Sequence, residues 1–116
     1  MKKLLFLLSL LPFISYGQEE VCTGDDGLCV VQFNAAFNTA NEVKWLEDLT
    51  DCSISTVDIM ADPTLPSEYK IVVVPTILIF NGDTEVARFQ ANIMMKMETE
   101  KKEVQGKIDE IIMDAF

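Results

Sequence analysis

The chain has 116 residues, a formal charge of −10 at pH 7 and no histidine, and 49% of its residues are hydrophobic. Its length fits one domain, and 19 acidic against 9 basic side chains argue against nucleic-acid binding, which requires a basic surface. Without histidine, the chain lacks the usual general base and the imidazole ligands of zinc sites, so we expect neither a metal site nor a cofactor.

The beginning of the chain has the pattern of a secretory signal peptide, which we assign to residues 1–17. Lysines precede an apolar run over residues 4–14, and residues 15–17, Ser-Tyr-Gly, form a small-x-small cleavage site. A membrane anchor is the alternative, but this run is shorter than the roughly 20 residues that a spanning helix needs. We therefore expect an exported protein, periplasmic or secreted, with no membrane span after cleavage.

The rest of the chain is expected to form a single domain. Residues 18–27 make a short polar lead that ends in a cluster of Gly and Asp, a composition typical of turns. No internal repeat, low-complexity run or linker interrupts residues 28–116, which we assign to the domain itself.

The first half of this domain reads as a strand, a helix and a second strand. Residues 28–33 are almost continuously apolar, which is typical of a strand covered on both faces. Residues 39–49 fit a helix that opens with a capping box and carries an apolar residue at every third position. Residues 54–60 are rich in β-branched side chains and follow as a strand, which completes a βαβ unit with parallel strands. The expected inward-facing residues of the helix are Ala40, Val43, Leu46 and Leu49.

The second half reads as a hairpin and a helix. Prolines punctuate the intervening loop, and the third strand begins at Pro75. Asn81 and Gly82 are a strong tight-turn signal before an antiparallel strand over residues 84–90. Residues 92–116 have helical periodicity, so the predicted order is β-α-β-β-α. The apolar stripe of this last helix comprises Ile93, Met94, Met97, Val104, Ile108, Ile111, Ile112 and Ala115.

This order of elements, with a proline directly before the third strand, resembles the thioredoxin fold. The most specific segment is residues 73–82, Val-Val-Pro-Thr-Ile-Leu-Ile-Phe-Asn-Gly, which is similar to the family's cis-proline, buried strand and Asn-Gly turn. Residues 33–37 resemble the strand end that leads into the family's active-site loop. The resemblance implies an α/β fold with a mixed four-stranded sheet and a cis peptide bond before Pro75. Because only a short lead precedes residue 28, the fold is shortened at its N-terminus by a strand and a helix.

The chain departs from the family at the redox site. The family's Cys-x-x-Cys falls on residues 38–41, Asn-Thr-Ala-Asn, so both thiol positions hold a carboxamide that cannot attack a disulfide. The family's buried carboxylate aligns with Gln32, and the lysine that often pairs with it aligns with Thr56. The resemblance therefore implies a domain that has lost dithiol-disulfide oxidoreductase activity.

A binding role at the same end of the sheet remains open. In the family, the residue before the cis-proline offers its backbone to an extended peptide, and that residue here is Val74. We expect an extended peptide or a partner protein to bind there, and the alternative is that these residues only close the end of the sheet. The candidate binding residues are Phe37, Asn38, Thr39, Ala40, Asn41, Val74, Pro75, Gln90 and Ala91.

The three cysteines leave several alternatives open. Cys29 and Cys52 are expected at the same end of neighbouring parallel strands, so a structural disulfide can join Cys52 to Cys29 or to Cys22. Pairing of Cys22 with Cys29, or three free thiols, are the other possibilities. The competing function is a thiol-disulfide oxidoreductase, or a redox-homeostasis protein, that uses these cysteines outside the usual motif. A purely structural protein of the cell envelope is the third reading.

Overall fold

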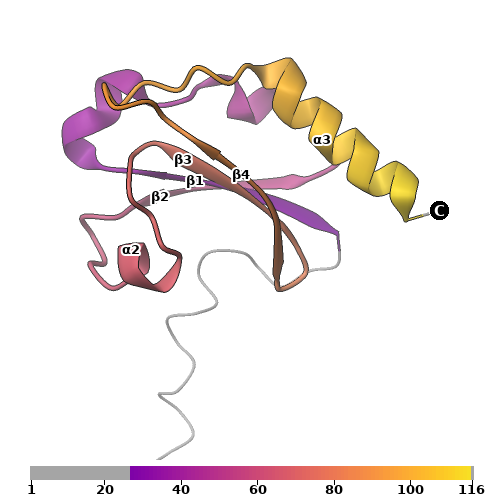
Figure 1. Cartoon of the computed structure of the whole chain (residues 1–116), viewed down its shortest axis with the longest axis horizontal. Coiled ribbons are helices and arrows are strands. Elements are labelled where there is room, and N and C mark those ends of the chain that lie inside the picture. Colours follow the sequence, from indigo (N-terminus) through magenta and orange to yellow (C-terminus); the bar gives the residue numbers. More distant parts are fainter. Residues whose placement is uncertain (1–26, 116) are drawn as a thin grey trace, which may run out of the picture.

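A mixed four-stranded sheet in the order β2-β1-β3-β4 forms the centre of the molecule (Figure 1). The computed structural model describes residues 27–115, so the predicted signal peptide, most of the polar lead and Phe116 lie outside the described residues. Strand β1 (Leu28–Asn34) runs parallel to β2 (Ser53–Asp58) and antiparallel to β3 (Thr76–Asn81). Strand β4 (Thr84–Gln90) pairs antiparallel with β3 and completes the sheet.

Helical segments cover both faces of this sheet. The 3-10 helix η3 (Trp45–Asp48) and helix α3 (Lys101–Asp114) pack on one face, and the short helix α2 (Leu65–Glu68) with its flanking loops packs on the other (Figure 1). A further 3-10 helix, η2 (Ala36–Asn41), follows the end of β1. Within residues 27–115, none of the helices has the length and apolar character to cross a membrane.

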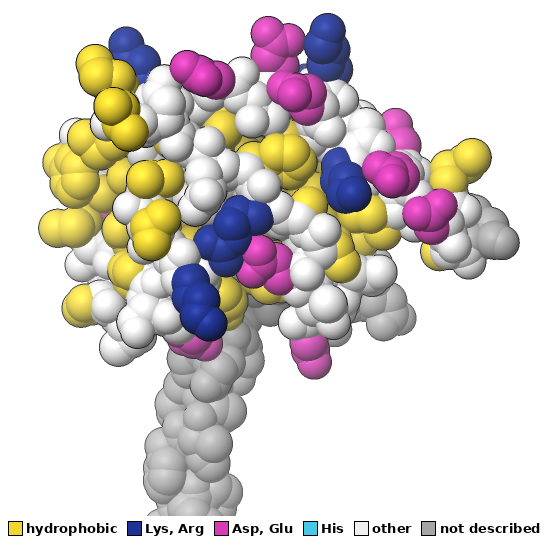
Figure 2. Space-filling model, in the orientation of Figure 1, with side chains coloured by type: hydrophobic (Ala, Val, Ile, Leu, Met, Phe, Trp, Pro, Cys, Tyr) yellow, Lys and Arg dark blue, Asp and Glu magenta, His cyan; other side chains and the backbone are white. Residues whose placement is uncertain are grey.

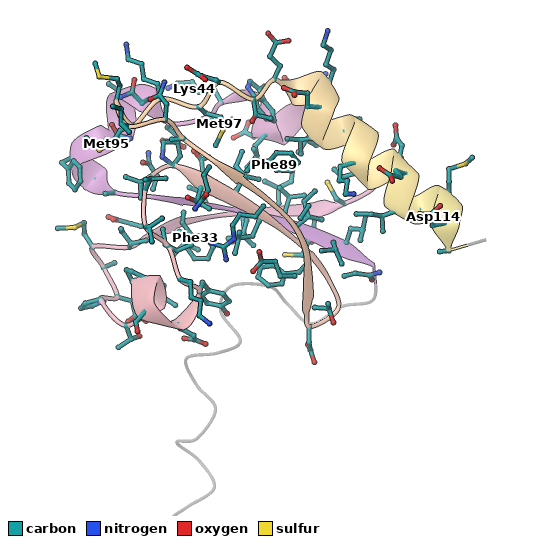
Figure 3. All side chains as sticks on the ribbon, viewed as in Figure 1. Phe33, Lys44, Phe89, Met95, Met97 and Asp114 are labelled. Atoms are coloured by element: carbon teal, nitrogen blue, oxygen red, sulfur yellow. The ribbon has the colours of Figure 1, made fainter. Side chains whose placement is uncertain are left out.

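Two apolar clusters, one on each face of the sheet, form the core. Because successive side chains of a strand point to opposite faces, β1 contributes Phe33 to the cluster beneath α2 and Val30 to the cluster beneath α3. In Figure 3, Phe33 lies on the α2 side of the sheet and Phe89 on the α3 side. All residues of β1 are buried, which confirms the prediction of a strand covered on both faces.

The strand predictions are confirmed. The four strands appear within two residues of the predicted positions, with the β3–β4 hairpin turning at Gly82, which has a φ of +65°. The peptide bond between Val74 and Pro75 is cis, as the resemblance implied. The predicted β-α-β-β-α order of a shortened thioredoxin-like fold thus describes the sheet correctly.

The predicted helix over residues 39–49 is wrong. Two short 3-10 helices stand in its place, separated by residues 42–44, which belong to neither. Thr39 forms no N-cap, because its hydroxyl donates to the carbonyl of Ala36 at 2.7 Å. Ala40 is exposed, whereas the other apolar residues predicted to face inward are buried. The apolar spacing therefore identified which side chains enter the core, although the backbone between them is not one helix.

Gln32 holds the break between η2 and η3. Its side chain is fully buried within β1, and its Oε1 accepts a hydrogen bond from the N–H of Val43 at 2.8 Å. Its Nε2 donates to the carbonyl of the same residue at 3.1 Å. A carboxamide can satisfy both backbone groups of Val43, whereas a carboxylate can only accept. This one side chain replaces the helical hydrogen bonds that Val43 lacks.

The C-terminal helix begins later than predicted, at Lys101 instead of residue 92. The side chain of Asn92 accepts hydrogen bonds from the N–H groups of Met94 and Lys96, and this local bonding competes with helix formation. Met95 then adopts a left-handed φ of 63°, which no helix accommodates. Ile93 and Met94, predicted to lie on the buried stripe, are consequently exposed. The later part of the stripe is confirmed in part, because Val104 and Ile108 are fully buried and Ile111 and Ile112 half-buried, whereas Ala115 is exposed.

The Gln32 side chain generates a stability prediction with a matched control inside the same protein. Gln32→Met leaves the buried N–H and carbonyl of Val43 without partners, which we expect to lower the free energy of unfolding by about 2–4 kcal/mol. Gln105 holds the backbone of Thr50 in the same two-bond manner, but at the surface. Because water can replace those bonds, we expect Gln105→Met to cost less than about 1 kcal/mol. Urea unfolding of both variants tests this, and equal losses would contradict it.

Candidate functional site

Asn38 lies at the centre of the candidate site, where β1 runs into η2. Its Nδ2 donates to the carbonyls of Val74 at 3.4 Å and Met95 at 3.2 Å, and to Oδ1 of Asn34 at 3.2 Å. Its Oδ1 accepts a hydrogen bond from Nδ2 of Asn41 at 2.8 Å. Only 3% of Asn38 is exposed. One buried amide therefore joins the end of β1, the cis-proline loop and the loop that follows β4.

The backbone around Asn38 is shaped by a reciprocal pair of asparagines. Nδ2 of Asn34 donates to the carbonyl of Asn38 at 3.2 Å, while Asn38 donates back to the Asn34 side chain. The N–H of Asn38 also bonds the carbonyl of Ala35, which closes the first turn of η2. Every buried side-chain nitrogen and oxygen within residues 27–115 has a hydrogen-bond partner. The amides of this network supply neither a thiol nor a general base.

The cis-proline loop is tied to its surroundings through its carbonyls. The hydroxyl of Thr76 donates to the carbonyl of Val73 at 2.7 Å, and the N–H of Ala91 donates to the carbonyl of Pro75 at 3.1 Å. With the Asn38 bond to Val74, all three successive carbonyls accept an internal hydrogen bond. In the described part of the chain, the N–H of Val74 makes no hydrogen bond. That N–H is the backbone group with which Val74 can bind an incoming peptide.

An exposed apolar surface surrounds this network. Phe37 is 67% exposed, Val72 77% and Ile93 94%, and these side chains line one hollow of about 270 Å³ together with Met95. Figure 2 shows hydrophobic side chains gathered at the end of the molecule where Figure 1 places η2. We call Phe37, Val72, Ile93 and Met95 the apolar end surface. A patch of this kind marks an interaction site more often than chance exposure does.

The structure brings together some of the predicted site residues and separates others. Asn38, Asn41 and Val74 meet in the amide network, and Val74 and Phe37 also line the hollow. Pro75 and Ala91 are buried beneath it and support the loop. The remaining predicted residues are exposed but do not line the hollow: Thr39, Ala40 and Gln90.

Three residues of the apolar end surface, Val72, Ile93 and Met95, are absent from the candidate binding residues predicted from the sequence. The sequence pattern makes Val72 the approach to a buried strand and places Ile93 on the stripe of a helix that does not form there. The available signal was Asn92, because an asparagine two residues after the end of a strand favours a turn.

The predicted disulfide from Cys52 is not formed. Cys52 is a free thiol in the structure, so it is bridged neither to Cys29 nor to Cys22, which lies outside the described residues. Burial raises the pKa of the Cys52 thiol, and the charge of Asp51 raises it further. A thiol of this kind is mostly protonated at neutral pH and is a poor nucleophile. In residues 27–115, no group of three or more Cys, Asp or Glu is placed to hold a metal ion.

Comparisons with known proteins bear on the fold. No protein-family model and no curated protein matches the sequence. Among solved structures, a mutant thioredoxin from Halobacterium salinarum NRC-1 matches with a TM-score of 0.59 at 20% identity, over 76% of this chain and 77% of that one. The chain has a thioredoxin-like fold. Thioredoxin 1 from Thermosipho africanus TCF52B matches with a TM-score of 0.56 at 20% identity, over 75% of this chain and 97% of its own. A thioredoxin-2 of a malaria parasite matches with a TM-score of 0.59 at 16% identity, over 74% of this chain and 84% of its own. At these identities the likeness establishes the fold alone.

The amide network of this thioredoxin-like domain predicts how its stability changes when the Nδ2 donor of Asn38 is removed. Asn38→Asp keeps the shape of the side chain but places a carboxylate against three oxygens that each accept from Asn38. We expect a loss of about 2–4 kcal/mol in the free energy of unfolding at neutral pH. The loss should shrink as the pH falls and the carboxyl regains a proton, because the protonated form is the one that the folded state favours.

The control is Asn81→Asp, at an exposed position at the end of β3 where, among the described residues, the side chain makes no hydrogen bond. A carboxylate there is solvated in both the folded and the unfolded state, so stability should change little and should not rise on acidification. Chemical unfolding at several pH values measures both variants. An Asn38→Asp protein whose stability does not depend on pH in this way would contradict the network.

The free thiol of Cys52 predicts slow but direct alkylation. Iodoacetamide should label Cys52 without prior reduction, more slowly than a small-molecule thiol at the same pH, since the raised pKa leaves little thiolate. The rate should rise with pH as the thiolate forms. Intact mass measures the labelling, and Cys52→Ser should remove that label. Labelling of Cys52 only after reduction would show that it is bridged.

Proposed function

We propose that this chain is an exported thioredoxin-like domain that has lost dithiol-disulfide oxidoreductase activity and binds an extended peptide or partner-protein segment at the apolar end surface. The observation that carries the proposal is Asn38, whose buried amide binds three segments at the position where the fold would place a redox thiol. The signal-peptide pattern of residues 1–17 supports export to the periplasm or the exterior.

The side chains at the redox position support loss of activity. Asn38 and Asn41 bond to each other at 2.8 Å, where the fold's two thiols would form a disulfide. Gln32, in place of the family's buried carboxylate, has both polar atoms committed to Val43 and cannot move protons to or from a thiol. These replacements are consistent with each other, because each exchanges an ionisable group for a hydrogen-bonded amide.

The exposed side chains support binding. Phe37, Val72 and Ile93 come from three separate segments of the chain, yet they converge on a single hollow. The Asn38 network fixes two of these segments relative to β1, so the surface is ordered before a ligand arrives. A preordered surface loses less conformational freedom on binding, which favours affinity. The free N–H of Val74 adds a backbone donor at the edge of the hollow.

The competing oxidoreductase function would have to use a cysteine outside the motif. Cys52 has a raised pKa, whereas redox-active cysteines have lowered ones. It also lies next to β2, at the end of that strand opposite to Asp58, and the apolar end surface adjoins the Asp58 end. An insulin-reduction assay separates the two functions. Turnover that disappears when any one of Cys22, Cys29 or Cys52 is replaced by Ser would overturn the proposed loss of activity.

The binding function is tested with peptides selected from a displayed library of random nonapeptides. Phe37→Ser and Ile93→Ser should each weaken the selected peptides by about tenfold or more, since each removes a large apolar contact. The matched control is Met113→Ser, because Met113 is 72% exposed but lies on α3, away from the hollow. We expect Met113→Ser to leave affinity unchanged. Failure to select any peptide, or equal effects of all three substitutions, would contradict a binding site at this surface.

A further inference from the structure

Strand β2 has an open outer edge. It pairs with β1 on one side, and among residues 27–115 no strand pairs with its other side. The N–H of Ile59 donates to the carbonyl of Asn34 at 2.9 Å, so the backbone groups of Ile59 and of every second residue before it in β2 face β1. In a parallel pair, alternate residues direct both backbone groups to the same neighbour, so those of Ile54 and Thr56 point outward. In the described chain, no hydrogen bond reaches these outward groups.

The opposite edge of the sheet is built differently. Strand β4 is disrupted by an irregularity in its pairing near Ile79 and Phe80, and it carries the ion pair of Glu85 with Arg88 at 2.8 Å. Irregular pairing and charged side chains are common ways to block the addition of another strand. β2, with the sequence Ser-Ile-Ser-Thr-Val-Asp, has neither a bulge nor a charge before its last residue. The sheet is thus protected at β4 and open at β2.

Two hollows run along the open edge. One, of about 490 Å³, lies between the η3 region and the first half of β2, and the other, of about 230 Å³, lies beside the end of β2. Glu42 and Thr56 line both hollows, so the two adjoin along the strand. An extended chain lying against β2 would have room for its side chains on this side of the sheet.

The charges along this edge select the kind of chain that fits. The carboxylates of Glu42, Glu47 and Asp58 line the hollows, against the single ammonium group of Lys44. The two ion pairs of the described chain lie elsewhere, in β4 and α3, so no cation neutralises these carboxylates. Lys and Arg side chains of an incoming strand would supply the missing positive charge.

We propose that the outer edge of β2 binds an extended, basic segment of a partner protein as an added fifth strand. The outward groups of Ile54 and Thr56 bond its backbone, and the carboxylates of the hollows bind its Lys and Arg side chains. The chain's own residues 18–26 are a poor occupant, since they contain four acidic residues and no basic one. A second copy is equally disfavoured, because its β2 edge presents the same carboxylates. This site shares no residue with the apolar end surface, so a test of one site does not decide the other.

Three synthetic heptapeptides test the proposal by NMR titration of the isotope-labelled mature protein. The first alternates Val with Lys, the second alternates Val with Glu, and the third keeps the Lys residues but replaces the inner Val residues by Pro, which cannot donate backbone hydrogen bonds. We expect only the first peptide to shift the amide signals of Ile54 and Thr56 and to slow their hydrogen exchange. If the Lys–Pro peptide binds as tightly as the Val–Lys peptide, binding depends on charge attraction alone and not on strand pairing, which would overturn the proposal. Shifts confined to Phe37 and Val72, or none at millimolar peptide, would also overturn it.

Two variants make the test specific to the edge. Thr56→Pro removes an outward N–H that β1 does not use, and Pro is tolerated at such edge positions, so the protein should fold and bind the Val–Lys peptide about tenfold more weakly. The double variant Glu42→Gln with Glu47→Gln keeps the backbone intact and should weaken binding by a similar factor. Its charge-matched control is Asp83→Asn with Asp114→Asn, remote from both hollows. Equal loss in the control and in the glutamate variant would overturn the assigned edge.

Discussion

The structure depends on how two protons of one buried amide are shared among three oxygens. Nδ2 of Asn38 is the donor for side-chain or backbone oxygens of Asn34, Val74 and Met95, which belong to segments far apart in sequence. No apolar contact could fix these segments so specifically, because hydrogen bonds are directional and their loss in a buried site is costly. Asn38 thereby ties η2 to the cis-proline loop and to the loop after β4.

The same constraint explains why the fold was more predictable than the site. Strand β1 and the β3–β4 hairpin were predicted because their signals, an apolar run and an Asn-Gly turn, are local. The break between η2 and η3 depends on Gln32, which bonds Val43 from 11 positions away, and Asn38 reaches Met95 across 57 positions. Periodicity contains no information about such partners. It predicted which side chains are buried and failed to predict the path of the backbone between them.

The exposed residues were missed for a related reason. Helical periodicity assigned Ile93 to the core, but an apolar stripe predicts burial only where a helix forms. Here the side chain of Asn92 accepts two local backbone hydrogen bonds, which favour a turn over a helix. Because α3 begins only at Lys101 and Met95 has a left-handed φ, the apolar side chains of Ile93 and Met94 are turned outward. An apolar residue in a loop whose conformation is held by hydrogen bonds is therefore a better indicator of an interaction surface than one on a regular element.

Under the proposed function, amides at the position of the family's thiols have two consequences that cannot be separated. A redox thiol must stay accessible and ionisable, so it cannot also serve as a buried connector of three segments. Asn38 is 3% exposed and its amide bonds three segments, so it makes this end of the sheet rigid. A rigid end of the sheet then holds Phe37 and Ile93 in fixed relative positions, which an interaction surface requires and a reaction cycle that opens and closes a disulfide does not. In the proposed function, the absence of redox thiols and the order of the apolar end surface are thus two results of the same amide network.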